Sequence, residues 1–286
     1  MAVGDDGAML LVVPSSPLAP RRPDPHFADE YEAARDLGLD CALVDHDALA
    51  AGDAAAGASR LPESDDVVYR GWMLDSERYA AFDAAVSARG SQLRTTGVSY
   101  RSAHELPGWI DSVRAHTAET MWTNDDSPAA FDEACRNLGS GPAVLRDYVK
   151  SAKHDWDTAV FIPDVADPGG ARPIATRFRE LRGDDFAGGF VVRRFERYVT
   201  AEVRTWWVDG VRAMVTSHPD TPDVLPDDFS MPVGLAAAIA SLGLPFVTAD
   251  LARRDDGKWR LIEIGDGQVS DRPRSTEPAE LLRVLG

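Results

Sequence analysis

Two acidic residues late in the sequence could together hold a divalent cation. Asp250 and Glu263 lie on either side of Asp256-Gly257, a dipeptide typical of a tight turn between antiparallel strands. If that turn is a two-residue loop, the two acids face one another with Cβ atoms about 5 Å apart, and they repel unless a cation separates them. Mg²⁺ prefers carboxylate oxygens, so the spacing predicts a magnesium site, to which Asp266 would add a third oxygen. A longer loop would shift the register and turn both acids toward water.

A second group of residues suits a polyphosphate. Only three of the 30 basic residues are lysines, and two of these, Lys150 and Lys153, are three positions apart. The segment 143–150 is typical of a strand, which would place Arg146, Tyr148 and Lys150 on one face before a loop of small residues. Lysine supplies a point charge and arginine a bidentate fork for phosphate. A solvated edge strand would have the same composition.

Between these two groups lie an apolar strand and a Glu-x-Arg pair. The strand predicted over Gly189–Glu196 could flank a flat ring and offer backbone groups to the ring edge. Glu202 and Arg204 alternate onto one face of the next strand. An isolated Glu-x-Arg is more often a cross-strand ion pair than a binding site.

The surrounding pattern predicts elements of both kinds. In the first 125 residues, strands alternate with helices, which indicates a small α/β lobe with a largely parallel sheet. The strands are expected at Met9–Val13, Cys41–Val44 and Val67–Met73, and the helices at Ala28–Leu37 and Ser76–Arg89. Residues 100–140 are expected to be mostly helical. Further on we expect a strand at Thr158–Ile162, helices at Ile174–Leu181 and Met231–Leu242, and hairpins around Asp209-Gly210 and Asp256-Gly257. The predicted domains are residues 1–125 and 126–286.

Composition narrows the class of protein. The 286 residues carry 47 acidic and 30 basic side chains, a net charge of −17, which opposes binding to nucleic acid. No apolar run is long enough to span a membrane. Two cysteines, Cys41 and Cys135, are too few for a disulfide framework and lack metal-site spacing. A cytoplasmic protein is expected.

Taken in order, these motifs resemble the ATP-grasp fold. The similarity is to uncharacterised bacterial ATP-grasp proteins, and four segments carry it: Arg146–Trp156 (RDYVKSAKHDW), Gly188–Phe195 (GGFVVRRF), Glu202–Trp206 (EVRTW) and Glu263–Ser270 (EIGDGQVS). The resemblance implies an α+β and α/β protein in which two α+β lobes clasp ATP, preceded by a small α/β lobe.

The resemblance also implies roles for individual residues. Lys150, with Arg146, would reach the nucleotide phosphates and the adenine edge, and Glu202 would hold the ribose hydroxyls. Arg204 would stabilise charge on a phosphate or acyl-phosphate, and Asp250 and Glu263 would bridge Mg²⁺. The adenine hinge would consist of Val192, Arg193, Arg194, Phe195 and Glu196.

This sequence departs from the family pattern at two positions. Arg146 stands where the family often has lysine, which keeps the charge and changes the shape. Gly265 stands where the family has a metal-binding asparagine, and Asp266 is expected to substitute for it.

The activity implied is an ATP- and Mg²⁺-dependent ligase that joins a carboxylate to an amine through an acyl-phosphate. Lys150, Lys153 and Arg204 would stabilise the transferred phosphoryl group. His154 is a candidate base, with a surface loop histidine as the alternative. Arg70, at the end of a strand in the first lobe, is a candidate for the acceptor carboxylate. The expected partners are small-molecule or peptide carboxylates and amines, and a homodimer is the common default.

A second class of function stays open at this point. Related eukaryotic cell-division-cycle ATP-grasp proteins bind nucleotide and serve as assembly factors. This chain would then be an ATP-binding assembly or regulatory protein without small-molecule ligase activity.

Overall fold

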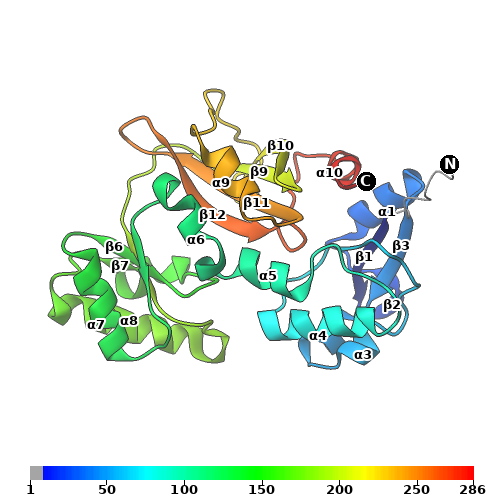
Figure 1. Ribbon diagram of the computed structural model, residues 1–286, viewed down its shortest axis with the longest axis horizontal. Coiled ribbons are helices and arrows are strands. Elements are labelled where there is room, and N and C mark those ends of the chain that lie inside the picture. Colours follow the sequence, from blue (N-terminus) through cyan, green and yellow to red (C-terminus); the bar gives the residue numbers. More distant parts are fainter. Residues whose placement is uncertain (1–8) are drawn as a thin grey trace. The chain divides into compact units, whose positions relative to one another are not determined.

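The computed structural model describes residues 9–286, which divide into two compact units (Figure 1). The first unit runs to Ala103 and also contains Ala201–Leu251 and Glu263–Gly286. The second unit consists of His104–Thr200 and Ala252–Ile262. The chain therefore leaves the first unit and returns to it twice. The sequence-based division into residues 1–125 and 126–286 follows chain order and stays a prediction.

The N-terminal sheet of the first unit is built around a buried central strand. β1 (Leu10–Ser16) pairs in parallel with β3 (Asp40–Val44) and β4 (Val67–Tyr69), and antiparallel with β2 (Ala19–Pro23). An unbroken apolar run such as Leu10–Val13 suits a parallel strand covered on both faces. The expected parallel α/β arrangement is confirmed, although the third predicted strand ends at Tyr69 instead of Met73.

Helices cover this sheet and close its core. α1 (Ala28–Asp36) and α10 (Pro278–Leu285) lie beside each other next to β1 and β3 (Figure 1), where Leu282 packs among residues of α1 and β1. α4 begins after Asp75, whose carboxylate accepts a hydrogen bond from the Arg78 backbone and caps the helix. The remaining helices of this part are α2 (His46–Ala50), α3 (Ala54–Gly57), α4 (Ser76–Ser87) and α5 (Gly97–His104).

A second sheet has the strand order β10-β9-β11-β12, and one of its hairpins has the expected turn. The strands are β9 (Val203–Val208), β10 (Val211–Ser217), β11 (Phe246–Arg253) and β12 (Trp259–Asp266). Asp209 and Gly210 both have positive φ, 48° and 74°, as a type I′ turn requires. The helix predicted over Met231–Leu242 is shorter: α9 spans Leu235–Ala240 and begins after Gly234, whose φ is 88°.

The other hairpin of this sheet differs from the expectation. The Gly257 N–H donates to the Arg254 carbonyl at 2.9 Å, and the Arg254 N–H donates to the Lys258 carbonyl at 2.8 Å. Arg254 and Lys258 therefore close a loop of three residues, with Gly257 at φ 85°. The predicted two-residue loop is wrong, and so is the register at the turn that was derived from it.

The second unit contains a sheet with the strand order β5-β8-β6-β7. The strands are β5 (Thr120–Trp122), β6 (Ala143–Arg146), β7 (Phe161–Ile162) and β8 (Val191–Arg194), and α7 (Pro128–Leu138) and α8 (Pro168–Arg182) lie beside β6 and β7 (Figure 1). Three expectations are wrong in extent: β6 ends four residues early, α8 begins six residues early, and 156–160 form a π-helix where a strand was predicted. α6 (Ile110–Val113) completes the α-helices of the described chain.

Across residues 9–286, none of the helices combines the length and the apolar character needed to cross a membrane.

The approach of β8 to β5 depends on Gly189. A Cβ at this position would lie 2.0 Å from the Thr123 carbonyl oxygen, next to the hydrogen bond from the Thr123 N–H to the Phe190 carbonyl at 2.9 Å. We expect Gly189→Ala to lower the free energy of unfolding by about 2 kcal/mol, because the strands must move apart. Urea denaturation measures the change. Gly286→Ala, whose Cβ would meet its nearest atom at 3.8 Å, is the control, and equal stability of the two variants would contradict the prediction.

Candidate functional site

A buried ion pair lies at the centre of the second sheet of the first unit. Asp250 on β11 is directly opposite Arg204 on β9, with Nε to Oδ1 at 2.8 Å and Nη2 to Oδ2 at 2.7 Å. Burial alone raises the pKa of Asp250, but Arg204 outweighs it, so the pKa of the carboxyl lies far below its usual value. Burial likewise lowers the pKa of Arg204, and Asp250 and Glu263 raise it above its usual value. Asp250 is therefore a carboxylate at any pH of interest.

His218 joins this pair, and the sequence reasoning missed it. Its Nε2 lies 3.6 Å from Asp250 Oδ2 and 3.9 Å from Glu202 Oε2. The signal was present in the hairpin at Asp209-Gly210. Ser217 pairs with Val203, and the same register continued by one residue places His218 opposite Glu202.

The arrangement of His218 suits a hydrogen-bond donor. The Asp220 backbone N–H donates to its Nδ1 at 3.1 Å, so a neutral imidazole carries its proton on Nε2. That proton faces the carboxylates of Asp250 and Glu202.

The oxygen-rich side chains here fit a hard cation such as Mg²⁺. Within the described residues, Glu202, His218 and Asp250 each offer one ligand atom, and the three atoms lie within 4.8 Å of one another. Glu263 is close enough for its charge to raise the pKa of Arg204. Carboxylate oxygens are the ligands that Mg²⁺ prefers, and each Asp250 oxygen keeps a lone pair besides the one that Arg204 uses.

Asp266 does not belong to this set. Side chains alternate along a strand, so Asp266 on β12 faces the side opposite to Glu263. It is 1% exposed, and its Oδ1 accepts from the Gln268 N–H at 2.9 Å. Burial raises the pKa of Asp266 to about 7. The expectation that Asp266 replaces the missing asparagine as a ligand is therefore not supported by its position.

Two hydroxyl groups lie where that asparagine would project. A Cβ on Gly265 would lie 3.1 Å from Thr248 Oγ1 and 3.3 Å from Ser270 Oγ, and these two hydroxyls are 2.8 Å apart. Both occupy the same face of the sheet as Glu263, because Gly265 is two residues further along β12.

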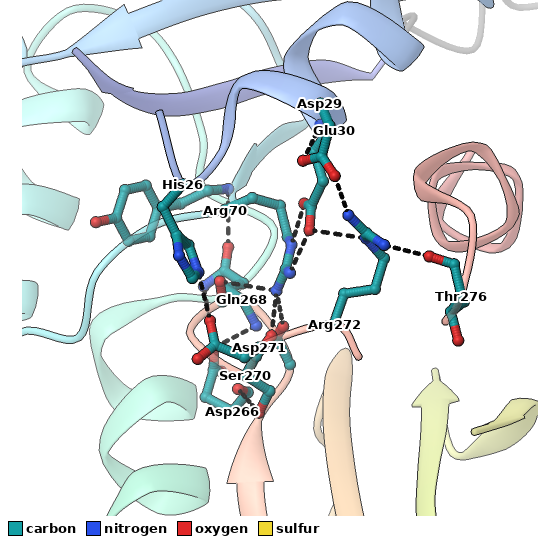
Figure 2. A network of polar contacts seen from close by, with 12 residues as sticks. His26, Asp29, Glu30, Arg70, Asp266, Gln268, Ser270, Asp271, Arg272 and Thr276 are labelled. Carbon is teal, nitrogen blue, oxygen red and sulfur yellow. Dashed lines mark hydrogen bonds and ion pairs between the residues drawn. The ribbon is translucent and has the colours of Figure 1, made fainter. Parts of the chain in front are cut away.

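Arg70 is buried in a network that Figure 2 shows from close by. Its Nε and Nη2 donate to the Glu30 carboxylate at 2.8 and 2.9 Å, and its Nη1 donates to the carbonyls of Gly267, Gln268 and Ser270 at 2.5, 3.1 and 2.8 Å. Only 1% of Arg70 is exposed. This guanidinium therefore holds the turn after β12, and its position does not support the predicted contact with an acceptor carboxylate.

In the second unit, the predicted phosphate-binding strand ends before it reaches Lys150. Asp147, fully buried, accepts from the backbone N–H groups of Val149 and Lys150 at 2.8 and 2.6 Å and from Arg182 at 2.8 Å. These bonds turn the chain, and the Tyr148 hydroxyl donates to the Thr123 carbonyl. Arg146, Tyr148 and Lys150 consequently do not share a strand face, and that prediction is wrong.

The basic residues around this turn fall into two kinds. Arg146 Nη2 donates to the Val149 carbonyl at 2.6 Å, so its guanidinium braces the turn. Lys150 is exposed just after it, and Lys153 and His154 are exposed on the short 3₁₀ helix that follows. The loop thus presents both lysines to solvent.

Most side chains of the predicted adenine hinge serve the fold. Val192 is buried in the core, Arg193 donates to the Ile262 carbonyl at 2.5 Å, and Arg194 donates to the Leu138 carbonyl at 2.5 Å. Glu196 accepts from Arg254 at 3.0 Å. What this segment leaves for a ligand is its backbone.

One hinge side chain has different surroundings. Phe195 lies 5.3 Å from Phe161, centroid to centroid, and Phe161 stacks on Trp156 at 5.8 Å. Trp156 is 42% exposed. These rings form an aromatic surface next to the hinge.

Solved structures of ATP-grasp proteins share this fold. A RimK domain ATP-grasp protein from Sphaerobacter thermophilus is 17% identical over 96% of this chain and all of its own, with a TM-score of 0.61. The D-cycloserine synthetase DcsG is 18% identical over 96% of this chain and 98% of its own, with a TM-score of 0.63. The ATP-grasp ligase PsnB, solved with a precursor variant, Mg and ADP, is 14% identical over 96% and 95%, with a TM-score of 0.58. The expected fold class is confirmed.

The sequence identifies the family more narrowly. Residues 137–285, more than half of the chain, match the model of an ATP-grasp domain family, described as family 3 of its clade. The chain belongs to this family. No curated protein matches it in sequence.

The buried Asp266 makes stability depend on pH. The folded carboxyl keeps its proton up to about pH 7, whereas an unfolded Asp releases it near pH 3.9, about 3 units lower. Because the folded state binds more protons in this range, stability falls as the pH rises from about 4 to about 7, by an amount on the order of 4 kcal/mol. We expect Asp266→Asn to remove this fall, measured by urea denaturation at pH 5 to 8. Asp255→Asn, at the exposed hairpin tip, is the control, and a D266N profile parallel to that of the wild type would contradict the assignment.

Proposed function

We propose that this protein is an ATP- and Mg²⁺-dependent ligase that joins a carboxylate to an amine through an acyl-phosphate. The observation that carries the proposal is the Arg204–Asp250 pair with Glu202 and Glu263 around it, in a chain of an ATP-grasp family. The titles of similar structures support it: DcsG is a synthetase, and PsnB is a ligase complexed with Mg and ADP.

In this proposal the acidic residues bind the metal and Arg204 acts on charge. Asp250 and Glu263 hold Mg²⁺, which when bound neutralises phosphate charge during transfer. Asp250 also fixes the Arg204 guanidinium in one orientation, so that its positive charge is ready where negative charge develops. Glu202, implied to be a ribose ligand by the resemblance, lies beside His218 and Asp250, and we assign it to the acidic set.

The second unit contributes the nucleotide contacts in this proposal. Lys150 and Lys153 bind phosphate, and the backbone of Val192–Glu196 borders the adenine ring. His154 is exposed in the same loop as the two lysines, and closing over phosphate suits that position better than a catalytic base.

The substrates proposed are a small-molecule or peptide carboxylate and an amine. PsnB is described as complexed with a precursor peptide, which supports the peptide alternative. A homodimer stays a prediction.

Ligand-induced stabilisation tests the cofactors first. With ATP and Mg²⁺ at about 100 times Kd, binding stabilises the folded state by ~2.7 kcal/mol, and the Tm of the wild type should rise by roughly 5–10 °C. We expect Glu263→Gln to lose the part of the shift that requires Mg²⁺, because a neutral amide holds the ion less well. Asp266→Asn, on the opposite face of the same strand, should keep it.

The same assay separates the alternatives. A Mg²⁺-dependent shift that is equal in wild type and Glu263→Gln would reject the metal assignment. ADP release that rises only when an acid and an amine are both present supports the ligase, whereas slow hydrolysis without that dependence would indicate an assembly protein.

Substitution of Lys150 tests the phosphate loop. A charge-assisted contact to phosphate contributes about 1.5–3 kcal/mol, so we expect Lys150→Ala to raise the KM for ATP by roughly tenfold or more in an ADP-release assay. Lys258→Ala removes the third lysine, which is exposed at the hairpin tip, and should leave the KM unchanged. Equal KM values for the two variants would argue against a role for the loop in binding ATP.

A further inference from the structure

The carboxyl ends of β1 and β4 form a topological switch point in the N-terminal sheet. β1 pairs in parallel with β3 on one side and with β4 on the other, so the chain passes from β1 to one neighbour and later crosses to the opposite side. Open α/β sheets bind ligands outside the carboxyl ends of their strands at such a point. The proposed function has not yet used this edge.

Two chain segments emerge at this edge and meet there. Asp24 follows β2 and donates its backbone N–H to the Pro14 carbonyl of β1 at 2.8 Å. Trp72 follows β4, and its Nε1 approaches Asp24 Oδ2 at 3.4 Å. The rings of His26 and Trp72 lie 4.5 Å apart, centroid to centroid.

A third segment arrives from β12. Asp271 Oδ1 lies 2.9 Å from His26 Nε2 (Figure 2). The turn before it is fixed to the end of β4, because Arg70 binds its carbonyls and Gln268 Oε1 accepts from the Tyr69 N–H at 3.1 Å. We name the surface formed by Asp24, His26, Trp72 and Asp271 the Trp72 surface.

The groups that solvent reaches on the Trp72 surface are aromatic and acidic. Trp72 is 39% exposed, and the side chains of His26 and Asp271 are 43% and 52% exposed. The nearby guanidinium groups are withdrawn: the side chains of Arg70 and Arg272 are 1% and 8% exposed, and both pair with Glu30. An aromatic face bordered by carboxylates suits a cation and opposes a carboxylate.

The Trp72 surface is also adjacent to the ion pair of the candidate site. The Asp271 carbonyl accepts from Arg204 Nη1 at 2.8 Å, so the residue whose side chain borders the aromatic face contacts the Arg204–Asp250 pair through its backbone. A ligand on this surface is one residue away from the group proposed to act on the phosphoryl or acyl-phosphate charge.

We propose that the Trp72 surface binds the amine substrate through a positively charged ammonium group. The proposal rests on the ligase function above, because that function requires an amine beside Arg204. Asp24 and Asp271 supply the charge complementarity, and the exposed indole of Trp72 supplies a face for the cation. The acceptor carboxylate is then bound elsewhere, in agreement with the burial of Arg70.

A pair of probes with equal shape and different charge tests the binding. ¹⁵N-labelled protein is titrated with n-butylammonium chloride and, separately, with n-butanol, and the Trp72 indole N–H signal is identified as the one that Trp72→Phe lacks. We expect a saturable shift of this signal with butylammonium and at least tenfold weaker binding of butanol. The double variant Asp24→Asn with Asp271→Asn should lose this preference, whereas Asp255→Asn, at the exposed hairpin tip, should keep it.

The outcomes separate this proposal from the ligase function. Equal responses to the two probes, or no response to either, would overturn the cation site, and they would not affect the Mg²⁺- and ATP-dependent Tm shift. If wild-type ADP release depends on an amine, Trp72→Ala should raise the KM for that amine at least tenfold and leave the KM for ATP unchanged. An unchanged KM for the amine would overturn the assignment of the substrate to this surface.

Discussion

The buried guanidinium of Arg70 joins the N-terminal sheet to the end of β12, and the geometry of the candidate site in the first unit depends on this connection. Arg70 is paired with Glu30 and binds three carbonyls of the Gly267–Ser270 turn. Removing one partner of such a buried pair leaves an uncompensated charge, which costs about 3–5 kcal/mol. The turn is therefore held firmly, and Asp271, directly after it, is placed to bind Arg204 through its carbonyl.

The second consequence concerns how charge is distributed over the two faces of β12. Glu263 lies on the face that carries Asp250 and Arg204, whereas Asp266 points to the opposite face and is buried with a raised pKa. One strand thus carries an ionised acid for a cation and a largely protonated acid for the core. The alternation of side chains along a strand is sufficient to produce this difference.

The sequence predicted the candidate site better where chemistry depended on alternation than where it depended on turns. Glu202, Arg204 and Asp250 were correctly grouped from their spacing, because strand pairing brings such residues together. The loop at Asp256-Gly257 and the turn at Asp147 were misjudged, since one extra residue or one buried carboxylate that binds three backbone N–H groups redirects the chain. His218 was missed because its position follows from extending a hairpin register, and no local motif marks a lone histidine.

The sequence by itself determined the class of fold, the order of the motifs and the residue types available for binding ATP and Mg²⁺. These follow from periodicity, turn dipeptides and charged residues at fixed spacing, which are local properties of the chain. The tertiary structure decided which charges remain available. Arg70, Arg193 and Arg194 have the same side chain as Arg204, yet their donors bind backbone carbonyls and Glu30. Only the packing of distant segments separates an arginine that braces a turn from one that lies beside a cation site, because burial and partners set the free energy of a charge.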